Sequence, residues 1–392
     1  MSDGLLLTGA TGFIGMEVLA RYLERTDRRV YTPIRAESQA HADQRMSGVI
    51  SALFARRGEP ESRVVRAYCD RVVALPMDLE SRTLGLGGRR SDWLAERVDD
   101  VIHCAASVAF AAPIAEQRAT NVQGTRRMLE LAQDCARRGG LRRFSYVSTA
   151  YVAGDHTGTF AEEDLEVGQR FRNTYERSKF EAEQLVRSRA HDLPIDIFRP
   201  SVVVGERTSG WTNSFNVVYW PVRAFRLGTY SALPARRASP IDVVPSDYVA
   251  DAIVALAERP EESGATHHLT AGEDAPAVGT LLDIAAERLS ARTPKVIPPW
   301  PYRKLVHPIL VQRAKGPRRS ALRHSEAYFP YFSMRLTFDD RRTRRRLNAL
   351  GVSYERVERY FHRLIDFALA TRFGRTPMTR VEARLWARER DR

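Results

Sequence analysis

The sequence has few cysteines, no metal-binding pattern and no long apolar run. Its three cysteines, Cys69, Cys104 and Cys135, lack the spacing of a disulfide framework or a metal site. We therefore expect a reducing, cytoplasmic environment and no bound metal. No stretch approaches the ~20 apolar residues of a membrane-spanning helix. The first predicted strand lies at the start of the chain, so we expect no signal peptide.

Lysine is also scarce. Only four of the 61 basic residues are lysines, at positions 179, 295, 304 and 315, and the formal net charge is +13. Such a charge attracts acidic partners, namely phosphate-bearing cofactors, an acidic carrier protein or anionic lipid headgroups. A genome that favours arginine codons is the alternative explanation. The basic residues are scattered and match no nucleic-acid-binding motif, so we expect no nucleic-acid partner.

A glycine-rich turn follows the first apolar segment, Leu5–Leu7, and precedes an amphipathic helix over residues 16–23. Glycines allow the backbone to approach a pyrophosphate, and the free N–H groups of the helix start bind its charge. The spacing is Gly-x-x-Gly-x-x-Gly, and a purely structural loop is the alternative. The predicted dinucleotide-binding residues are Thr8, Gly9, Thr11, Gly12, Phe13, Ile14 and Gly15.

The end of the second predicted strand, residues 29–35, indicates which dinucleotide binds. An NAD site places an acid there, whereas an arginine accommodates the 2′-phosphate of NADP. No acid occurs between Arg28 and Arg35. We therefore predict NADP(H), with Arg35 at the phosphate; an ordinary exposed arginine is the alternative.

Two further strand ends are expected to contact the cofactor. Asp78 and Leu79 follow the third strand, where the Asp either accepts from the adenine amino group or caps the next turn. Cys104, Ala105 and Ala106 end the fourth strand, and such small residues let a cofactor lie close to the sheet edge.

Tyr175 and Lys179 lie four residues apart in a predicted helix and therefore share a face. A cation beside a phenol lowers the pKa of the phenol, which makes it an acid or base near neutral pH. Two hydroxyls, Ser148 and Thr149, stand at the carboxyl end of the fifth strand. The alternative is a tyrosine packed on the sheet beside a solvated lysine. The chain uses arginine at almost every other basic position, so a lysine at this one favours a functional role.

The glycine turn, the Tyr175-x-x-x-Lys179 pair and the hydroxyls upstream resemble the extended short-chain dehydrogenase/reductase superfamily. The resemblance implies that Tyr175 donates or accepts a proton and that Lys179 binds the nicotinamide ribose. It places the carbonyl-binding hydroxyl at Thr149, with Ser148 as the second choice, and the helix asparagine of the family at Asn121. The segment over the nicotinamide corresponds to Pro200, Ser201, Val202 and Val203.

Four segments, 101–108, 147–152, 210–216 and 242–249, resemble the fatty acyl-CoA reductase and thioester reductase branch, the male sterility-type NAD-binding proteins. The likeness covers roughly residues 4–272, with Ser246 as a departure. It implies NADPH-dependent reduction of an acyl-CoA or acyl-carrier-protein thioester to an aldehyde or alcohol by direct hydride transfer. Another extended short-chain enzyme, acting on a sterol, hydroxyketone or nucleotide sugar, and a non-catalytic NADP-binding sensor stay open.

Alternating strands and helices predict an α/β fold, a Rossmann-type doubly wound parallel sheet with a smaller, mostly helical C-terminal substrate lobe. We assign residues 1–204 and 241–272 to the NADP-binding domain, and 205–240 and 273–392 to the lobe. Aromatic residues in 205–240 suit an acyl chain, although a core without a ligand is the alternative. They are Trp211, Phe215, Tyr219, Trp220, Phe225 and Tyr230.

The last hundred residues contain three further signals. Residues 298–311, which include Trp300 and Lys304, fit a basic, apolar stretch that faces a membrane, or else a lid or packing element. Ser353 is expected to cap a helix with an apolar stripe. Thr376 and Pro377 are expected to start a final arginine-rich helix that is either exposed or bound to a partner. The sequence predicts neither the acyl chain length nor the oligomeric state.

Overall fold

The computed structural model describes residues 3–56, 58–59, 62–215, 218–226, 232–259, 264–316, 319, 322–323 and 326–391. Of the residues singled out in the sequence, Tyr230 lies outside this set. Among the described residues, no helix is both long and apolar enough to cross a bilayer.

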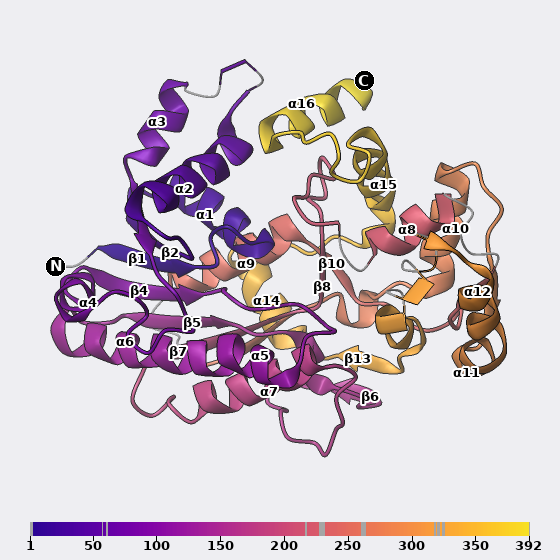
Figure 1. Ribbon diagram of the computed structural model, residues 1–392, viewed down its shortest axis with the longest axis horizontal. Coiled ribbons are helices and arrows are strands. Elements are labelled where there is room, and N and C mark those ends of the chain that lie inside the picture. The colour runs from indigo at the N-terminus through magenta and orange to yellow at the C-terminus, as the bar shows by residue number, and fades with distance from the viewer. Residues whose placement is uncertain are drawn as a thin grey trace.

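Seven parallel strands form the central sheet, in the order β11-β7-β5-β4-β1-β2-β3 (Figure 1). The chain runs from β1 outward to β3 and then returns to β4 on the other side of β1, so the order reverses between β1 and β4. This confirms the predicted doubly wound sheet, whose ligand crevice lies at such a reversal. The strands are β1 (Gly4–Thr8), β2 (Arg29–Ile34), β3 (Val72–Pro76), β4 (Val98–His103), β5 (Arg143–Val147), β7 (Ile195–Pro200) and β11 (Thr266–Leu269).

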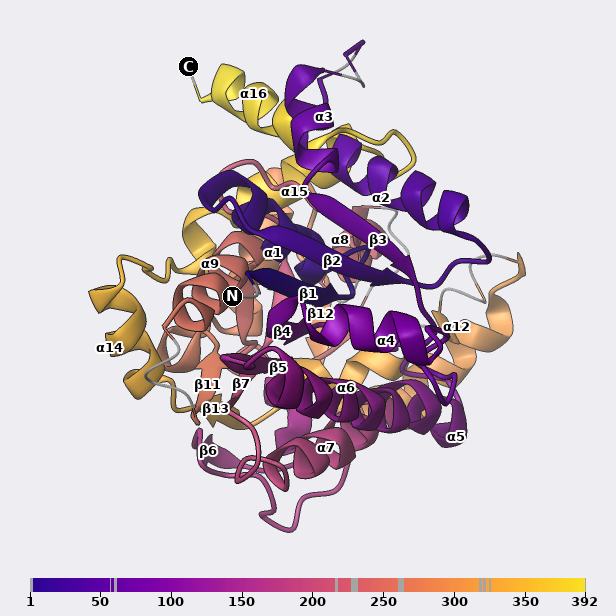
Figure 2. The same ribbon diagram turned by 90° about the vertical axis from the view of Figure 1, so that its left-hand side faces the viewer.

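Helices cover both faces of the sheet (Figure 2). Strand β1 is buried throughout, as is typical of a parallel strand between two helical layers. Successive side chains of a strand point to opposite faces, so Leu5 and Leu7 join one apolar cluster and Leu6 another. The first cluster includes α1 (Phe13–Arg25), α2 (Gln39–Phe54) and α9 (Ser246–Ala257); the second includes α4 (Gly88–Ala95), α6 (Gly124–Arg138) and α7 (Thr174–Arg187).

Short parallel strand pairs connect the sheet to the rest of the chain. They are β8 (Val202–Val204) with β10 (Val243–Pro245), β9 (Ala232–Pro234) with β12 (Lys295–Ile297), and β6 (Gly158–Phe160) with β13 (Leu336–Phe338). Between them lie α8 (Tyr219–Arg226), α10 (Val278–Arg288), α11 (Pro299–Pro301), α12 (His307–Arg313) and a 3₁₀ segment, η6 (Glu326–Ser333). Of these elements, α8, β9, α10, η6 and β13 join α15 (Phe361–Ala370) in a further apolar core.

The C-terminal helices return to the nucleotide-binding sheet. Helix α14 (Arg341–Ala349) packs on α9 and β11, and α16 (Arg380–Arg390) packs on α2 (Figures 1 and 2). The division into two domains stays a prediction, and these two helices, assigned to the substrate lobe, contact the other domain. The helix expected from Ser353 begins at Phe361, after a 3₁₀ turn, η7 (Val357–Arg359).

An ion pair and a hydrogen bond hold the C-terminal segment in place. The Arg384 guanidinium donates to the buried Glu206 carboxylate, with Nε 2.9 Å from Oε1. The Trp211 indole N–H donates to the carbonyl oxygen of Met378, at 3.0 Å. The C-terminal segment therefore braces the loop that follows β8.

Candidate active site

A cleft of about 1290 Å³ opens at the carboxyl ends of β1, β4, β5 and β7. Ordinary small-molecule pockets hold roughly 300–1,000 Å³, so this cleft has room for a dinucleotide and a second molecule. Of the residues predicted from the sequence, those that line it are Gly9, Thr11, Gly12, Phe13, Ile14, Gly15, Cys104, Ala106, Ser148, Thr149, Tyr175, Lys179, Pro200, Ser201, Val202 and Val203.

The glycine turn fits a pyrophosphate. Gly9 has a φ of +74°, and a Cβ on it would lie 2.7 Å from the amide nitrogen of Ala105. A Cβ on Gly15 would lie 2.1 Å from the carbonyl oxygen of Gly9, so only glycine permits this close packing. Helix α1 starts directly after Gly12, and the amide groups of its first turn have no intrahelical partner. Those amides and the positive end of the helix dipole provide an anion site.

Thr8 and Ala105 were predicted to contact the cofactor, but in the structure they pack behind the glycine turn. The Thr8 hydroxyl is hydrogen-bonded to Nδ1 of His103, at 2.7 Å, and accepts from the Ala105 amide, at 3.1 Å. Neither Thr8 nor Ala105 lines the cleft. Cys104 does, but burial raises the pKa of its thiol to about 12, so it is no thiolate nucleophile at neutral pH.

The predicted adenine-side residues, Arg35, Asp78 and Leu79, lie outside the cleft lining. Arg35 is 72 % exposed and pairs with Glu80 at 3.4 Å. The Asp78 carboxylate accepts from the Glu80 amide, at 3.0 Å, which is the turn-capping role given above as the alternative. An exposed ion pair contributes at most about 1 kcal/mol to stability. The 2′-phosphate of NADP could therefore replace the Glu80 carboxylate beside Arg35.

Lys179 lines the cleft but is almost fully buried. Its side chain is 2 % exposed, and its ammonium donates to the Tyr146 hydroxyl at 2.7 Å and to the Val147 carbonyl oxygen at 2.8 Å. Burial lowers the pKa of Lys179 to about 7, although the Glu183 charge acts in the opposite direction. The ammonium is therefore poised to gain or lose its proton near neutral pH.

The pKa of Tyr175 shifts in the direction opposite to the one expected. Burial raises it to about 12, and a hydrogen bond with the Thr149 side chain offsets only part of this effect. The expectation of a lowered tyrosine pKa is therefore wrong in this structure, because the Lys179 ammonium hydrogen-bonds to Tyr146 and Val147 and burial dominates. Tyr175 stays a protonated phenol at neutral pH, which suits a proton donor.

The two candidate hydroxyls have different partners. Ser148 donates to the buried carboxylate of Glu183, at 2.6 Å, and so belongs to the packing beneath the sheet edge. Thr149 accepts from the Tyr151 amide, at 3.3 Å, donates to the Pro200 carbonyl oxygen, at 3.4 Å, and lowers the pKa of the nearby Tyr175 phenol. Thr149 is therefore the hydroxyl beside the tyrosine.

Asn121 is buried in a π-helical turn, η1 (Arg118–Gln123), and does not line the cleft. Its side-chain oxygen accepts from the Ser107 amide at 2.7 Å, and its side-chain nitrogen donates to the Ser178 hydroxyl at 2.9 Å. It connects the loop after β4 to the helix that carries Tyr175 and Lys179.

An aromatic wall on the substrate side was missed in the sequence. The Phe110 ring lies 5.6 Å from Tyr175 and stacks on Tyr331, at 5.9 Å, which in turn meets Tyr151 edge-on, at 5.2 Å. Tyr328, near Phe110, completes the wall. Only the folded chain brings η6 to this place. Asn213, Ser214, Arg319 and Arg323 also line the cleft.

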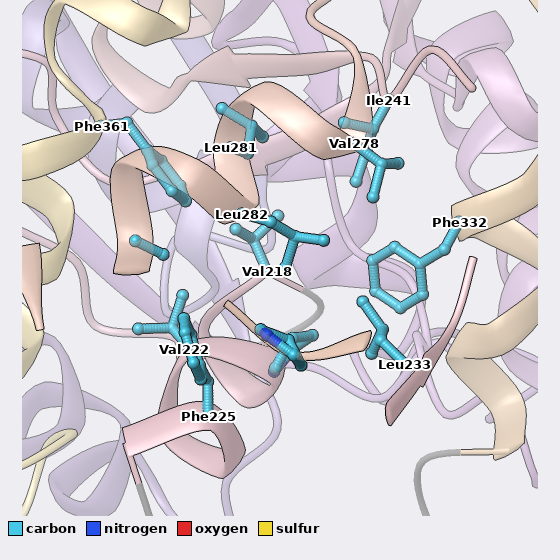
Figure 3. Close-up of a pocket in the computed structure, with 13 residues that line it drawn as sticks. Val218, Val222, Phe225, Leu233, Ile241, Val278, Leu281, Leu282, Phe332 and Phe361 are labelled. Atoms are coloured by element: carbon cyan, nitrogen blue, oxygen red, sulfur yellow. The ribbon is translucent and has the colours of Figure 1, made fainter. Parts of the chain in front are cut away.

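A second, apolar cavity of about 60 Å³ lies next to this wall, since Phe332 lines it and the preceding residue, Tyr331, lines the cleft. Every described residue around it is apolar, and most come from α8, β9, α10, α15 and η6, with Val218, Ile241 and Pro294 from connecting segments (Figure 3). Among them are Val218, Leu233 and Phe225 of the segment 205–240, which was predicted to suit an acyl chain. Within the described residues, no group of three or more histidine, cysteine or acidic side chains could hold a metal.

Comparison with known proteins identifies the family. Residues 7–253 match the model of an NAD-binding family described as male sterility protein. The chain belongs to this family. Over 273 residues it is 31 % identical to a glycine betaine reductase of Emericella nidulans, and the match covers 68 % of this chain and 21 % of that protein. It is 24 % identical to the fatty acyl-CoA reductase wat of Drosophila melanogaster, over 65 % of this chain and 54 % of that protein.

A solved structure shares nearly the whole fold. The terminal R domain from the myxalamid PKS-NRPS biosynthetic pathway matches with a TM-score of 0.80 and 26 % identity, over 96 % of this chain and 93 % of that one. These findings confirm the resemblance to the extended short-chain reductases. These findings support an NAD(P)-dependent oxidoreductase, and the chain spans only about a fifth of the length of the glycine betaine reductase that it matches.

Proposed function

We propose that this reductase converts a fatty acyl thioester, carried by CoA or by an acyl-carrier protein, to an aldehyde or alcohol with NADPH. The observation that carries the proposal is the common cleft: Thr149, Tyr175 and Lys179 line the same space as the glycine turn. One relative described above is a fatty acyl-CoA reductase, and the solved structure described above is a terminal R domain. Both names support a thioester as the substrate class.

The preference for NADPH over NADH rests on the end of β2. The residue there is Arg35 rather than an acid, and an arginine accommodates a 2′-phosphate. The first-turn amides of α1 would hold the pyrophosphate, and Lys179 would bind the nicotinamide ribose. NADPH supplies the hydride.

The carbonyl oxygen of the thioester would lie between the hydroxyls of Thr149 and Tyr175. Both side chains line the cleft, and Thr149 is close enough to Tyr175 to lower the pKa of its phenol, so a single oxygen placed between them can accept from both. Their hydrogen bonds strengthen as negative charge grows on that oxygen. Tyr175 then gives up its proton, and the Lys179 cation stabilises the phenolate that remains.

Loss of the thiol from the resulting hemithioacetal leaves the aldehyde, and a second reduction gives the alcohol. The protein needs no cysteine nucleophile for this sequence. Cys104, the cysteine in the cleft lining, is a protonated thiol at neutral pH because burial raises its pKa to about 12.

The acyl chain would lie along the aromatic wall of Phe110, Tyr328 and Tyr331. Large apolar surface with few polar groups is what a hydrocarbon chain requires. The apolar cavity beyond Phe332 offers space for the far end of the chain (Figure 3).

The test follows NADPH oxidation and free thiol together with palmitoyl-CoA as substrate. Thiol release by the wild-type protein that is lost in Tyr175→Phe supports the proposal. A control is Tyr248→Phe, since Tyr248 is a buried tyrosine that lies on α9 outside the cleft lining, and its hydroxyl has no hydrogen-bond partner among the described residues. NADPH oxidation without thiol release would indicate another extended short-chain activity, and NADP binding without turnover on any substrate would indicate a sensor.

A further inference from the structure

One helical run presents large apolar side chains to solvent. It consists of α11, the π-helical turn η5 (Tyr302–Val306) and α12, and is called here the 299–313 helix. Trp300 is 66 % exposed, Leu305 63 % and Ile309 49 %, and the first two are the most exposed large apolar residues among those described. Exposed apolar side chains gathered in this way mark an interaction site.

The opposite side of the 299–313 helix is anchored in the protein. Tyr302 and His307 are buried, and both pack edge-on against the ring of Phe329, at 5.6 and 5.1 Å. The π-helical turn adds one residue to the helical repeat, which keeps Tyr302 and His307 on the same inner side. The apolar outer residues are therefore a fixed surface of the folded protein.

The sequence segment that contains this surface carries only basic charged residues. Residues 288–325 contain ten arginines and lysines and no acid. Arg303, Lys304 and Arg313 are exposed on the helix itself, and the Lys304 ammonium lies 5.0 Å above the Trp300 ring. Glu326, the first acid after this segment, pairs with His307 of the helix.

The lysine content of this segment favours a lipid surface over a protein partner. Three of the four lysines of the chain lie in residues 288–325, at positions 295, 304 and 315. Lysine is depleted from protein interfaces, whereas lysine and arginine with tryptophan and aliphatic residues are typical of helices that lie in an anionic membrane surface. Long basic side chains can lay their stems on the apolar layer and keep the charge at the headgroups.

We propose that the 299–313 helix docks the protein on an anionic lipid bilayer. Trp300, Leu305 and Ile309 enter the interface, and Arg303 and Lys304 bind lipid phosphates. Figure 1 shows α11 and α12 at the end of the molecule opposite to β1, so the nucleotide-binding sheet does not obstruct this face. The same acid-free segment continues to Arg319 and Arg323 at the cleft, so docking brings the entrance near lipid.

The experiment measures co-sedimentation of the full chain with vesicles. Neutral phosphatidylcholine vesicles are compared with vesicles that also contain phosphatidylglycerol, at low and high salt. Binding to the anionic vesicles is expected to be at least about tenfold stronger and to weaken with salt, because exposed charges are screened. The triple variant Trp300→Glu, Leu305→Glu, Ile309→Glu is expected to lose at least tenfold of this binding.

A matched control carries the same three added charges elsewhere. Val64→Glu, Val167→Glu, Leu385→Glu alters three exposed apolar residues outside the 299–313 helix and should bind vesicles like the wild type. Brominated lipid should quench the wild-type tryptophan fluorescence, and Trp300→Phe should lose this quenching but retain binding. Equal vesicle binding by both triple variants, or no preference of the wild type for anionic vesicles, overturns the proposal.

Two readouts separate this inference from the proposed function. Both triple variants should reduce a water-soluble short-chain thioester at the wild-type rate, which also shows that they fold. Absence of turnover in all three proteins would refute the proposed function and leave the vesicle result intact. If the helix variant instead loses only activity on an acyl-carrier-protein thioester without lipid, the surface binds a protein and the lipid assignment fails.

Discussion

Replacing Lys179 with methionine should stabilise the protein more at pH 7 than at pH 10. The unfolded chain keeps the lysine proton up to a pKa of 10.5, whereas the folded protein releases it at about 7. Between these values the unfolded state binds more protons, so stability rises with pH. By this linkage the buried ammonium costs about 4 kcal/mol at pH 7 and about 1 kcal/mol at pH 10.

The assay is urea unfolding of the wild-type and Lys179→Met proteins, without added cofactor, at both pH values. The difference in unfolding free energy between the two proteins should change by about 3 kcal/mol from pH 7 to pH 10. Packing changes caused by the methionine are the same at both values and cancel in this comparison. Lys295→Met removes an exposed lysine on β12 and should show no such change.

The reasoning fails if the Lys179→Met difference is the same at pH 7 and pH 10. That result would mean that water or a rearranged partner keeps the ammonium charged inside the fold. The variant should also lose turnover while it gains stability at pH 7, since the charge that destabilises the fold is the one the phenolate needs.

Three other predictions follow from the site. Tyr146→Phe removes a hydrogen bond to the Lys179 ammonium, so the pKa of that lysine should fall further and the alkaline limb of the kcat/KM profile should move to lower pH by about one unit. Arg35→Ala should weaken NADPH binding at least tenfold and leave NADH binding unchanged in titrations; equal effects on both would discard the phosphate assignment. Arg384→Ala leaves the buried Glu206 carboxylate without its main partner and should cost about 2 kcal/mol in thermal unfolding, with no loss expected if solvent replaces the arginine.

The sheet and its crevice could be predicted because their signals are local. Consecutive residues predict a strand, a turn and a helix, namely Leu5–Leu7, the glycine turn and the amphipathic segment that follows. In a parallel sheet all carboxyl ends lie at one edge, so residues that follow different strands, such as Cys104 and Thr149, must meet. Tyr175 and Lys179 share a helix face by spacing alone.

The rest of the site depends on contacts between distant segments. Tyr331 belongs to a 3₁₀ segment with no motif, and it reaches the cleft because its hydroxyl donates to Glu176, at 2.6 Å. The partner of Lys179, Tyr146, lies on β5, and the sequence does not state where an ammonium will point. The tyrosine pKa was mispredicted for this reason: a charge effect was read from spacing, but burial decided the net shift.

The helix ends show a similar limit. Ser353 has the side chain of a helix cap, yet the helix starts at Phe361, because a 3₁₀ turn precedes it. The final helix begins instead with a capping box, in which the Thr379 hydroxyl accepts from the Glu382 amide and the Glu382 carboxylate accepts from the Thr379 amide. The apolar stripe predicted that α15 would be buried on one side, but not against which partner.

The central claim is that Thr149, Tyr175 and Lys179 reduce an acyl thioester with NADPH. Its most direct test is thiol release from palmitoyl-CoA, measured in step with NADPH oxidation, for the wild type and Tyr175→Phe. The account predicts release by the wild type and a loss of at least about 100-fold in the variant, as is usual when a positioned acid is removed. Equal thiol release by both proteins would contradict it.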